Sequence, residues 1–201
     1  MLANGTTTTT IDELVGLFAP DQPSEVTGDI AEWNLVCASE LPGSQSLILD
    51  AALKRLDDMA NHVSSEIRRN YYRFLLNPAE GEFSRAKYLV LMMVTVLQQD
   101  FGVQYNPDCI RNPDFRDAGD LFIHGMLGGK GGTCASMPVL YVAIGRRLGW
   151  PIKLVHTLSH VFCRWDDAEG RHQFGKERFN IEATGRGTNF FPDDYYRTRR
   201  P

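Results

Sequence analysis

One cysteine in the second half of the chain stands where a glycine-rich loop meets an apolar helical pattern. Residues 128–133 read GGKGGT, Cys134 follows, and apolar residues then recur with helical spacing from 135 to 148. We expect Thr133 to be the N-cap of this helix and Cys134 to lie in its first turn. Unpaired backbone N–H groups at a helix start favour an anion, and they could also bind the oxyanion of a tetrahedral intermediate. The position therefore suits a nucleophilic thiolate.

A thiolate nucleophile needs a second group that takes and returns a proton, and imidazole is the usual one. The chain has five histidines, of which His160 begins an apolar, strand-like segment. We expect this segment to face the helix that follows the cysteine, so His160 is the candidate base. His62 and His172 are expected to be exposed, whereas His156 on the preceding strand and His124 in a long loop remain alternatives.

The imidazole of a nucleophile–base pair is usually oriented by a third side chain. Asn180 and Glu182 lie two residues apart on the next expected strand, so both side chains point to the same face of the sheet. Either could bind the ring nitrogen of His160 that faces away from the thiol. The third member is therefore Glu182 or Asn180 on these grounds alone.

Glycines before the cysteine lack side chains and would let a substrate backbone lie close to the thiol. We expect the substrate or oxyanion site, or the positions that support its residues from behind, to include Gly131, Gly132, Thr133, Asn180 and His124. The predicted reaction is attack of the thiolate on a protein or peptide amide, followed by release to water or to an amine. It needs no cofactor and no metal.

Two other interpretations fit the same residues. The chain could be a non-catalytic binding module that uses its helical half as a docking surface and tolerates loss of Cys134. It could also be a metal hydrolase, since Cys134, His160 and Glu182 have the composition of an open three-ligand zinc site. The glycine-rich loop would have no explanation in a metal site.

The elements that must position these residues change in character along the chain. Residues 1–10 are of low complexity, and we expect them to be a disordered tail. Residues 11–201 are expected to form a single domain whose first half, 11–100, is helical. The spacing of apolar residues, with its start and stop signals, predicts helices at 11–18, 29–41, 46–76 and 84–99.

The second half of the chain predicts a different architecture. A long loop is expected over 101–133, and the region 134–196 then holds the cysteine helix and a small sheet. Three short segments have strand-like composition, at 152–156, 160–165 and 178–183. Helices followed by a helix packed on a small antiparallel sheet make the expected fold class α+β.

Composition argues against several classes of function. The net charge is −4 and the basic residues form no tract before the last few positions, so nonspecific nucleic-acid binding is not expected. The longest apolar run, residues 88–97, is about half a membrane span, and the first residues lack a secretory pattern. We expect a cytoplasmic protein with no membrane partner, whose four cysteines are free thiols and include no CxxC pair. The oligomeric state is open.

The site residues also carry a resemblance to a known family. Gly132-Thr-Cys134-Ala-Ser136, the helix end Leu148-Gly149-Trp-Pro151, the strand histidine and the segment Glu182-Ala-Thr184 together resemble the transglutaminase-like superfamily. The resemblance implies a papain-like α+β fold and a catalytic triad of Cys134, His160 and Glu182.

More narrowly, the chain looks like the SirB1-like branch of that superfamily, over nearly everything from about residue 28 to 196. The motifs that carry this likeness are Asn34-Leu35 with Ala38-Ser-Glu40-Leu-Pro42, Arg55-Leu-Asp57, Leu97-Gln-Gln-Asp-Phe-Gly102, His124-Gly125 and Phe179-Asn-Ile-Glu-Ala-Thr-Gly-Arg-Gly187.

The chain departs from the superfamily's pattern at three points. The third member is usually Asp, where this chain has Glu182, and the residue after the cysteine is often larger than Ala135. Papain-type enzymes draw an oxyanion donor from a Gln shortly before the cysteine, and residues 124–133 contain none. A second donor must therefore be a backbone N–H or a side chain from elsewhere in the fold.

Overall fold

The computed structural model describes residues 28–110, 116–158, 160–172, 174–185 and 189–198. The tail expected at 1–10 and the helix expected at 11–18 lie outside these residues. In chain order the elements are α2 (Ile30–Ala38), α3 (Leu49–Leu76), η1 (Pro78–Gly81), α4 (Arg85–Gln99), η2 (Pro107–Cys109), α5 (Ala118–Leu121), α6 (Ile123–Leu127), α7 (Met137–Arg147), β1 (Ile152–His156), β2 (Val161–Asp166), β3 (Arg178–Ile181) and α8 (Asp193–Thr198). The predicted α+β class is confirmed.

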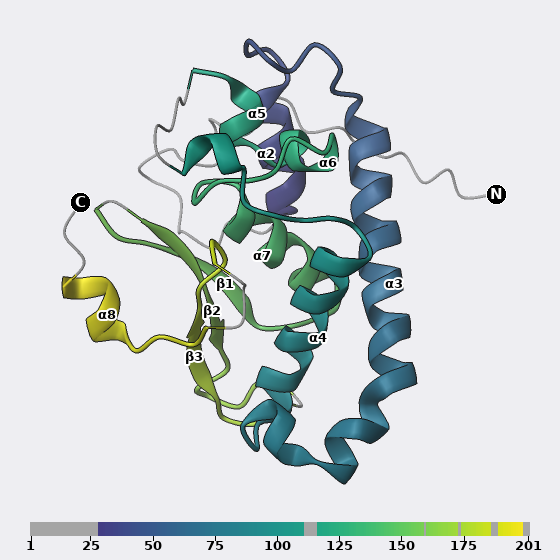
Figure 1. Cartoon of the computed structure of the whole chain (residues 1–201), viewed down its shortest axis with the longest axis vertical. Coiled ribbons are helices and arrows are strands. Elements are labelled where there is room, and N and C mark those ends of the chain that lie inside the picture. Colours follow the sequence, from purple (N-terminus) through teal and green to yellow (C-terminus); the bar gives the residue numbers. More distant parts are fainter. Residues whose placement is uncertain (1–27, 111–115, 159, 173, 186–188, 199–201) are drawn as a thin grey trace.

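The helices α3 and α4 form a hairpin along one side of the molecule (Figure 1). One stripe of α3 is buried, because its small and apolar residues recur every three or four positions: Ala52, Leu56, Met59, Ala60 and Val63. The start of α4 is set by Ser84, whose Oγ accepts the backbone N–H of Lys87 at 3.0 Å. Local spacing and capping were enough to predict both helices.

The centre of the molecule is α7. Every residue from Met137 to Gly145 is buried, and the helix contacts α2, α3, β1 and β2. Figure 1 shows it between the α3–α4 hairpin and the sheet. The absence of a side chain at Gly145 lets β1 come close, since a Cβ there would meet Cγ2 of Ile152 at 2.5 Å. The sheet is thereby held against the helix that follows Cys134.

The sheet is antiparallel, in the order β1-β2-β3, with Ile152 opposite Trp165 and Arg164 opposite Asn180. One face packs on α7, where Cys163 Sγ lies 3.2 Å from the carbonyl oxygen of Pro138. The other face is covered by α8, whose Tyr196 ring stacks on Phe162 with centroids 3.8 Å apart (Figure 1). The sequence had not predicted α8, because six residues are too few to show a helical period.

The sequence predicted one long loop over 101–133, and this prediction needs correction. The segment contains the short helical segments η2, α5 and α6. Asparagine and aspartate side chains start two of them. Asn106 Oδ1 accepts the N–H of Asp108 at 3.1 Å, and Asp117 Oδ1 accepts the N–H of Gly119 at 2.7 Å. Segments of three to five residues bury no periodic stripe, so their sequence resembles that of a loop.

Candidate active site

Cys134 lies in a turn directly before α7 rather than inside the helix, which begins at Met137 and not at residue 135. Pro138 explains the later start, because it has no N–H to donate to the carbonyl of Cys134 and is tolerated only in the first helical turn. The turn is still joined to the helix, since the N–H of Met137 donates to the carbonyl of Thr133 at 3.0 Å.

Thr133 and Ser136 close this turn with reciprocal hydrogen bonds. Thr133 Oγ1 accepts the N–H of Ala135 at 3.2 Å, and Ser136 Oγ accepts the N–H of Thr133 at 3.0 Å. The expectation that Thr133 is the N-cap is wrong, because the N-cap of α7 is Ser136. The two hydrogen bonds instead brace the turn ahead of the helix and fix the backbone on both sides of Cys134.

A cavity of about 440 Å³ opens beside this turn and is lined by Tyr105, Ile110, Cys134, His160 and Thr184. Cys134 is partly exposed, and Ile110 is 67% exposed. The structure therefore brings the expected nucleophile and the expected base, which are 26 positions apart, to one cavity that solvent can reach.

His160 is paired with Glu182. Nε2 of His160 lies 2.9 Å from Oε2 of Glu182, and the two side chains are only 10% and 5% exposed. The other carboxylate oxygen, Oε1, accepts the hydroxyl of Thr184 at 2.6 Å and its backbone N–H at 3.1 Å. Both oxygens of the buried carboxylate are thus satisfied, as a buried charge requires.

These hydrogen bonds set the charge state of Glu182. Burial by itself raises the pKa of the carboxyl, but the hydrogen bonds from His160 and Thr184 outweigh it and lower the pKa from 4.5 to about 2. Glu182 is therefore a carboxylate at neutral pH. A strongly shifted acid beside an open cavity is typical of a functional site.

Asn180, the alternative partner for His160, makes other contacts. Its Oδ1 accepts Nε–H of Arg164 at 2.7 Å, and its Nδ2 donates to the carbonyl of Phe191 at 3.0 Å and to Asp193 at 2.8 Å. Asn180 therefore ties the sheet to the segment that leads into α8, while Glu182 is the residue that contacts His160.

The helix α8 closes the far side of this pair. The ring of Tyr196 is nearly parallel to that of His160, with centroids 6.1 Å apart. Burial and the negative charge of Glu182 raise the pKa of Tyr196, so its hydroxyl stays neutral beside the carboxylate. The histidine and its acid are thereby shielded from water on the side away from the cavity.

Tyr105 belongs to the site, although the sequence did not single it out. Its backbone runs beside that of Gly132. The N–H of Gly132 donates to the backbone carbonyl of Gln104 at 2.9 Å, and the N–H of Asn106 donates to the backbone carbonyl of Gly132 at 2.7 Å. The phenol lies near enough to the backbone N–H of Cys134 for that N–H to offset part of the rise that burial causes in the phenol's pKa. No local pattern could have revealed this contact, because it joins segments 29 positions apart.

The glycines before Cys134 have a different role from the one expected. Gly131 and Gly132 are buried, and Gly131 has a φ of +90°. A Cβ at Gly131 would lie 2.9 Å from Cα of Asn106, and one at Gly132 would lie 2.3 Å from Sδ of Met126. They make room for this chain's own neighbouring segments rather than for a substrate.

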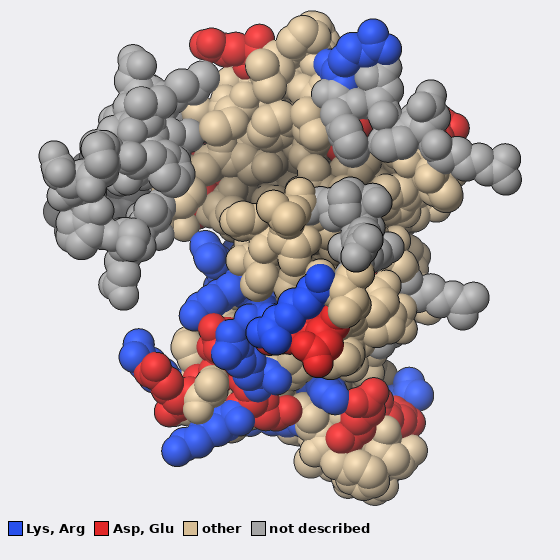
Figure 2. Space-filling model, turned by 90° about the vertical axis from the view of Figure 1, so that its left-hand side faces the viewer, with Lys and Arg blue, Asp and Glu red and all other residues tan. Residues whose placement is uncertain are grey.

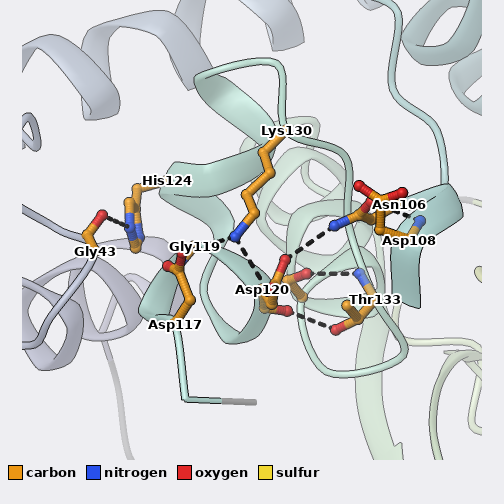
Figure 3. Close-up of polar contacts among 10 residues, drawn as sticks. Gly43, Asn106, Asp108, Asp117, Gly119, Asp120, His124, Lys130 and Thr133 are labelled. Atoms are coloured by element: carbon orange, nitrogen blue, oxygen red, sulfur yellow. Dashed lines mark hydrogen bonds and ion pairs between the residues drawn. The ribbon is translucent and has the colours of Figure 1, made fainter. Parts of the chain in front are cut away.

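A polar network braces the loop that leads to Cys134, and Asp120 is at its centre (Figure 3). Its buried carboxylate accepts Nδ2 of Asn106 at 3.0 Å and lies 3.0 Å from Nζ of Lys130, which also contacts Asp117. Its backbone carbonyl accepts the hydroxyl of Thr133 at 2.7 Å. Asp120 thus links Asn106, which follows Tyr105, to Thr133, which precedes Cys134.

His124, a sequence candidate for the site, points the other way along this network (Figure 3). Its Nε2 lies 3.3 Å from the carbonyl oxygen of Gly43 and 3.3 Å from Oγ of Ser44. His124 therefore secures the connection between α2 and α3 rather than lining the cavity of Cys134.

A match to a protein-family model shows which family the chain belongs to. The model describes the transglutaminase-like superfamily, and it matches residues 50–200, which include the turn, the strands and the His–Glu pair. The chain belongs to this superfamily.

Part of this transglutaminase-like chain is also similar to curated proteins. Over 75 residues it is 36% identical to F-box only protein 21 of Homo sapiens and 35% identical to the protein of that name from Mus musculus. The matched segment is 37% of this chain and 12% of each relative, so the chain spans a small part of their length. No solved structure matches the chain significantly.

The other cysteines of the transglutaminase-like chain lie in contrasting surroundings. All four are free thiols, as expected, but Cys109 and Cys163 are buried while Cys37 is exposed. Burial and the charge of Glu182 raise the pKa of the Cys163 thiol well above its ordinary value. Cys37 is thus the natural reference for the reactivity of Cys134.

The face that carries the sheet and α8 shows basic and acidic side chains side by side (Figure 2). The cations of its strands and helix pair with carboxylates: Lys153 and Arg178 with Asp166, Arg164 with Asp193, and Arg197 with Asp194. Within the described residues, no group of three or more His, Cys, Asp or Glu could hold a metal ion. No helix in that part of the chain could span a bilayer.

Proposed function

We propose that this transglutaminase-like chain is a cysteine-dependent hydrolase or acyltransferase that acts on an amide of a protein or peptide. The observation that supports it best is one cavity lined by Cys134 and His160, with Nε2 of His160 held at 2.9 Å by a buried carboxylate. The motifs shared with the SirB1-like branch support placing the chain there. Membership in the superfamily supports the class of chemistry.

The first half of the reaction forms a thioester. Because Glu182 binds Nε2 of His160, proton exchange with the thiol goes through Nδ1. The thiol proton moves to His160, and the thiolate attacks the amide carbonyl, whose π electrons move to oxygen. When the tetrahedral intermediate collapses, the C–N bond breaks and His160 returns its proton to the leaving amine.

The second half releases the acyl group. His160 takes a proton from water or from an amine, which then attacks the thioester carbonyl and displaces the thiolate. Water yields a carboxylic acid, and an amine yields a new amide. Throughout, the carboxylate of Glu182 keeps the imidazole in one orientation and stabilises its charged form.

The test is the rate at which iodoacetamide labels each cysteine of the folded protein, followed by peptide mapping. We expect Cys134 to label faster than Cys37, although Cys37 is the more exposed thiol, because a thiolate–imidazolium pair is the more nucleophilic form. Cys134→Ser should remove the fast phase, and Cys37→Ala should leave it unchanged.

A non-catalytic binding module makes the opposite prediction. Labelling would then follow exposure, with Cys37 ahead of Cys134 and the buried Cys109 and Cys163 last. That order would overturn the proposed function.

A further inference from the structure

The proposed reaction leaves one requirement unassigned. A tetrahedral intermediate carries a negative oxygen, and enzymes stabilise it with at least one preorganised donor, commonly two. The backbone N–H of Cys134 can supply one. The papain-type Gln is absent from residues 124–133, so a second donor has to come from elsewhere in the chain.

The side chains that line the cavity narrow the choice. Ile110 has no donor, the hydroxyl of Thr184 donates to Glu182 at 2.6 Å, and the imidazole of His160 is occupied with the proton transfers. Among the described residues that line the cavity, Tyr105 has the one remaining hydroxyl.

The position of this hydroxyl is informative. The phenol of Tyr105 lines the same cavity as Cys134, and it lies near enough to the backbone N–H of Cys134 for that N–H to lower the pKa of the phenol. A substrate oxygen that accepts the N–H would lie against the phenol, within reach of its O–H. An oxygen in that position could accept a hydrogen bond from the N–H and another from the O–H.

We propose that Tyr105 is a catalytic residue whose hydroxyl, together with the backbone N–H of Cys134, forms the oxyanion hole. This inference rests on the proposed function. As the thiolate attacks, the carbonyl π electrons move to oxygen, and Tyr105 donates a hydrogen bond to that oxygen without transferring its proton. When the intermediate collapses, the electron pair returns to form the carbonyl and the hydrogen bond weakens.

Two features keep this donor ready. The bridge between Tyr105 and Gly132 and the contacts of Asp120 hold the two segments in fixed register, so little reorganisation is needed during the reaction. Burial, followed by the neighbouring Cys134 and Cys109 side chains, raises the pKa of Tyr105 more than the N–H of Cys134 lowers it. The phenol therefore keeps its proton at neutral pH and can donate a hydrogen bond.

The test compares two reactions of Cys134 that differ in whether an oxyanion forms. Iodoacetamide alkylates the thiolate by displacing iodide, without an oxyanion. p-Nitrophenyl acetate acylates it through a tetrahedral intermediate and releases p-nitrophenolate. In Tyr105→Phe, which keeps the ring, we expect the acylation burst to slow by about 100-fold or more, while alkylation continues at a comparable rate. The control is Tyr72→Phe, which removes a hydroxyl from the exposed surface of α3.

The outcomes separate this inference from the proposed function. If the wild type shows neither an acylation burst nor preferential alkylation at Cys134, the proposed function fails and the inference fails with it. If the wild type reacts and Tyr105→Phe acylates as fast, or faster because a blocking group has gone, only the role of Tyr105 is overturned. If Tyr105→Phe slows acylation and alkylation equally, the role of Tyr105 in the oxyanion hole is also overturned, because the hydroxyl would then support the thiol or the fold.

Discussion

Two histidine–carboxylate pairs of almost equal length lie in different regions of the molecule. Between α3 and the end of α4, Nε2 of His62 lies 2.8 Å from Asp100, and the side chains are 43% and 45% exposed. Beside the cavity, Nε2 of His160 lies 2.9 Å from Glu182, and the side chains are 10% and 5% exposed. The two pairs can scarcely be told apart by distance.

Their surroundings differ in two ways. Water screens the exposed pair, whereas the buried pair interacts in a medium of lower dielectric. The imidazole of the buried pair lines a cavity together with Cys134. The comparison teaches that burial and neighbours, not the hydrogen-bond length, decide whether such a pair can serve chemistry.

The largest expected effect comes from removing each imidazole in turn. His160→Ala should slow acylation of Cys134 by p-nitrophenyl acetate by about 10²- to 10⁴-fold, because the thiol loses its proton carrier. His62→Ala should leave the burst unchanged, because His62 does not line the cavity of Cys134. Similar losses in both variants would show that His160 acts through the fold, and no loss in either would remove it from the mechanism.

An intermediate effect is expected in the stability of the protein in acid. The pKa of Glu182 is lowered from 4.5 to about 2, so the folded state favours the carboxylate more than the unfolded state does. The resulting stabilisation is present above about pH 5 and is lost as the pH falls toward 2, by about 3 kcal/mol in total. Urea unfolding over this range should therefore show a steeper loss for the wild type than for Glu182→Gln.

Thr184→Val provides a graded control for that measurement. This substitution removes one hydroxyl donor to Glu182 but leaves His160 in place. The unfolding free energy that Thr184→Val loses in acid should therefore lie between the losses of the wild type and of Glu182→Gln. Parallel curves for all three proteins would mean that the Glu182 pKa is not lowered in the folded state.

The smallest expected effect separates the two candidate partners of His160. Glu182→Gln should slow alkylation of Cys134 at neutral pH by about tenfold, since a hydrogen bond between charged groups is roughly twice as strong as a neutral one. Asn180→Ala should slow alkylation less, because the side chain of Asn180 contacts Arg164 and Asp193 instead of His160. The measurement is the pH dependence of the alkylation rate, and a larger shift for Asn180→Ala would make Asn180 the orienting residue.

The elements that could be predicted are those whose signals are local. The apolar stripe of α3, the cap of α4 at Ser84 and the strand β1 all appeared within a few residues of their expected bounds. The short segments η2, α5, α6 and α8 could not be predicted in this way, because each is too short to repeat a pattern. Side-chain caps start η2 and α5, and an aromatic contact holds α8. The N–H of Ile123 in α6 donates to Oδ1 of the distant Asn34.

The sequence by itself determined which residue types could react: a cysteine between a glycine-rich loop and an apolar helix, a histidine at a strand start, and two possible partners on the next strand. Only the tertiary structure distinguished those partners. The register that sets Arg164 opposite Asn180 brings the amide against the guanidinium, while Glu182, directly after the end of β3, contacts His160. Tyr105 beside Cys134 is likewise a tertiary result, because the bridge to Gly132 and the hydrogen bonds of Asp120 join segments that no local periodicity relates.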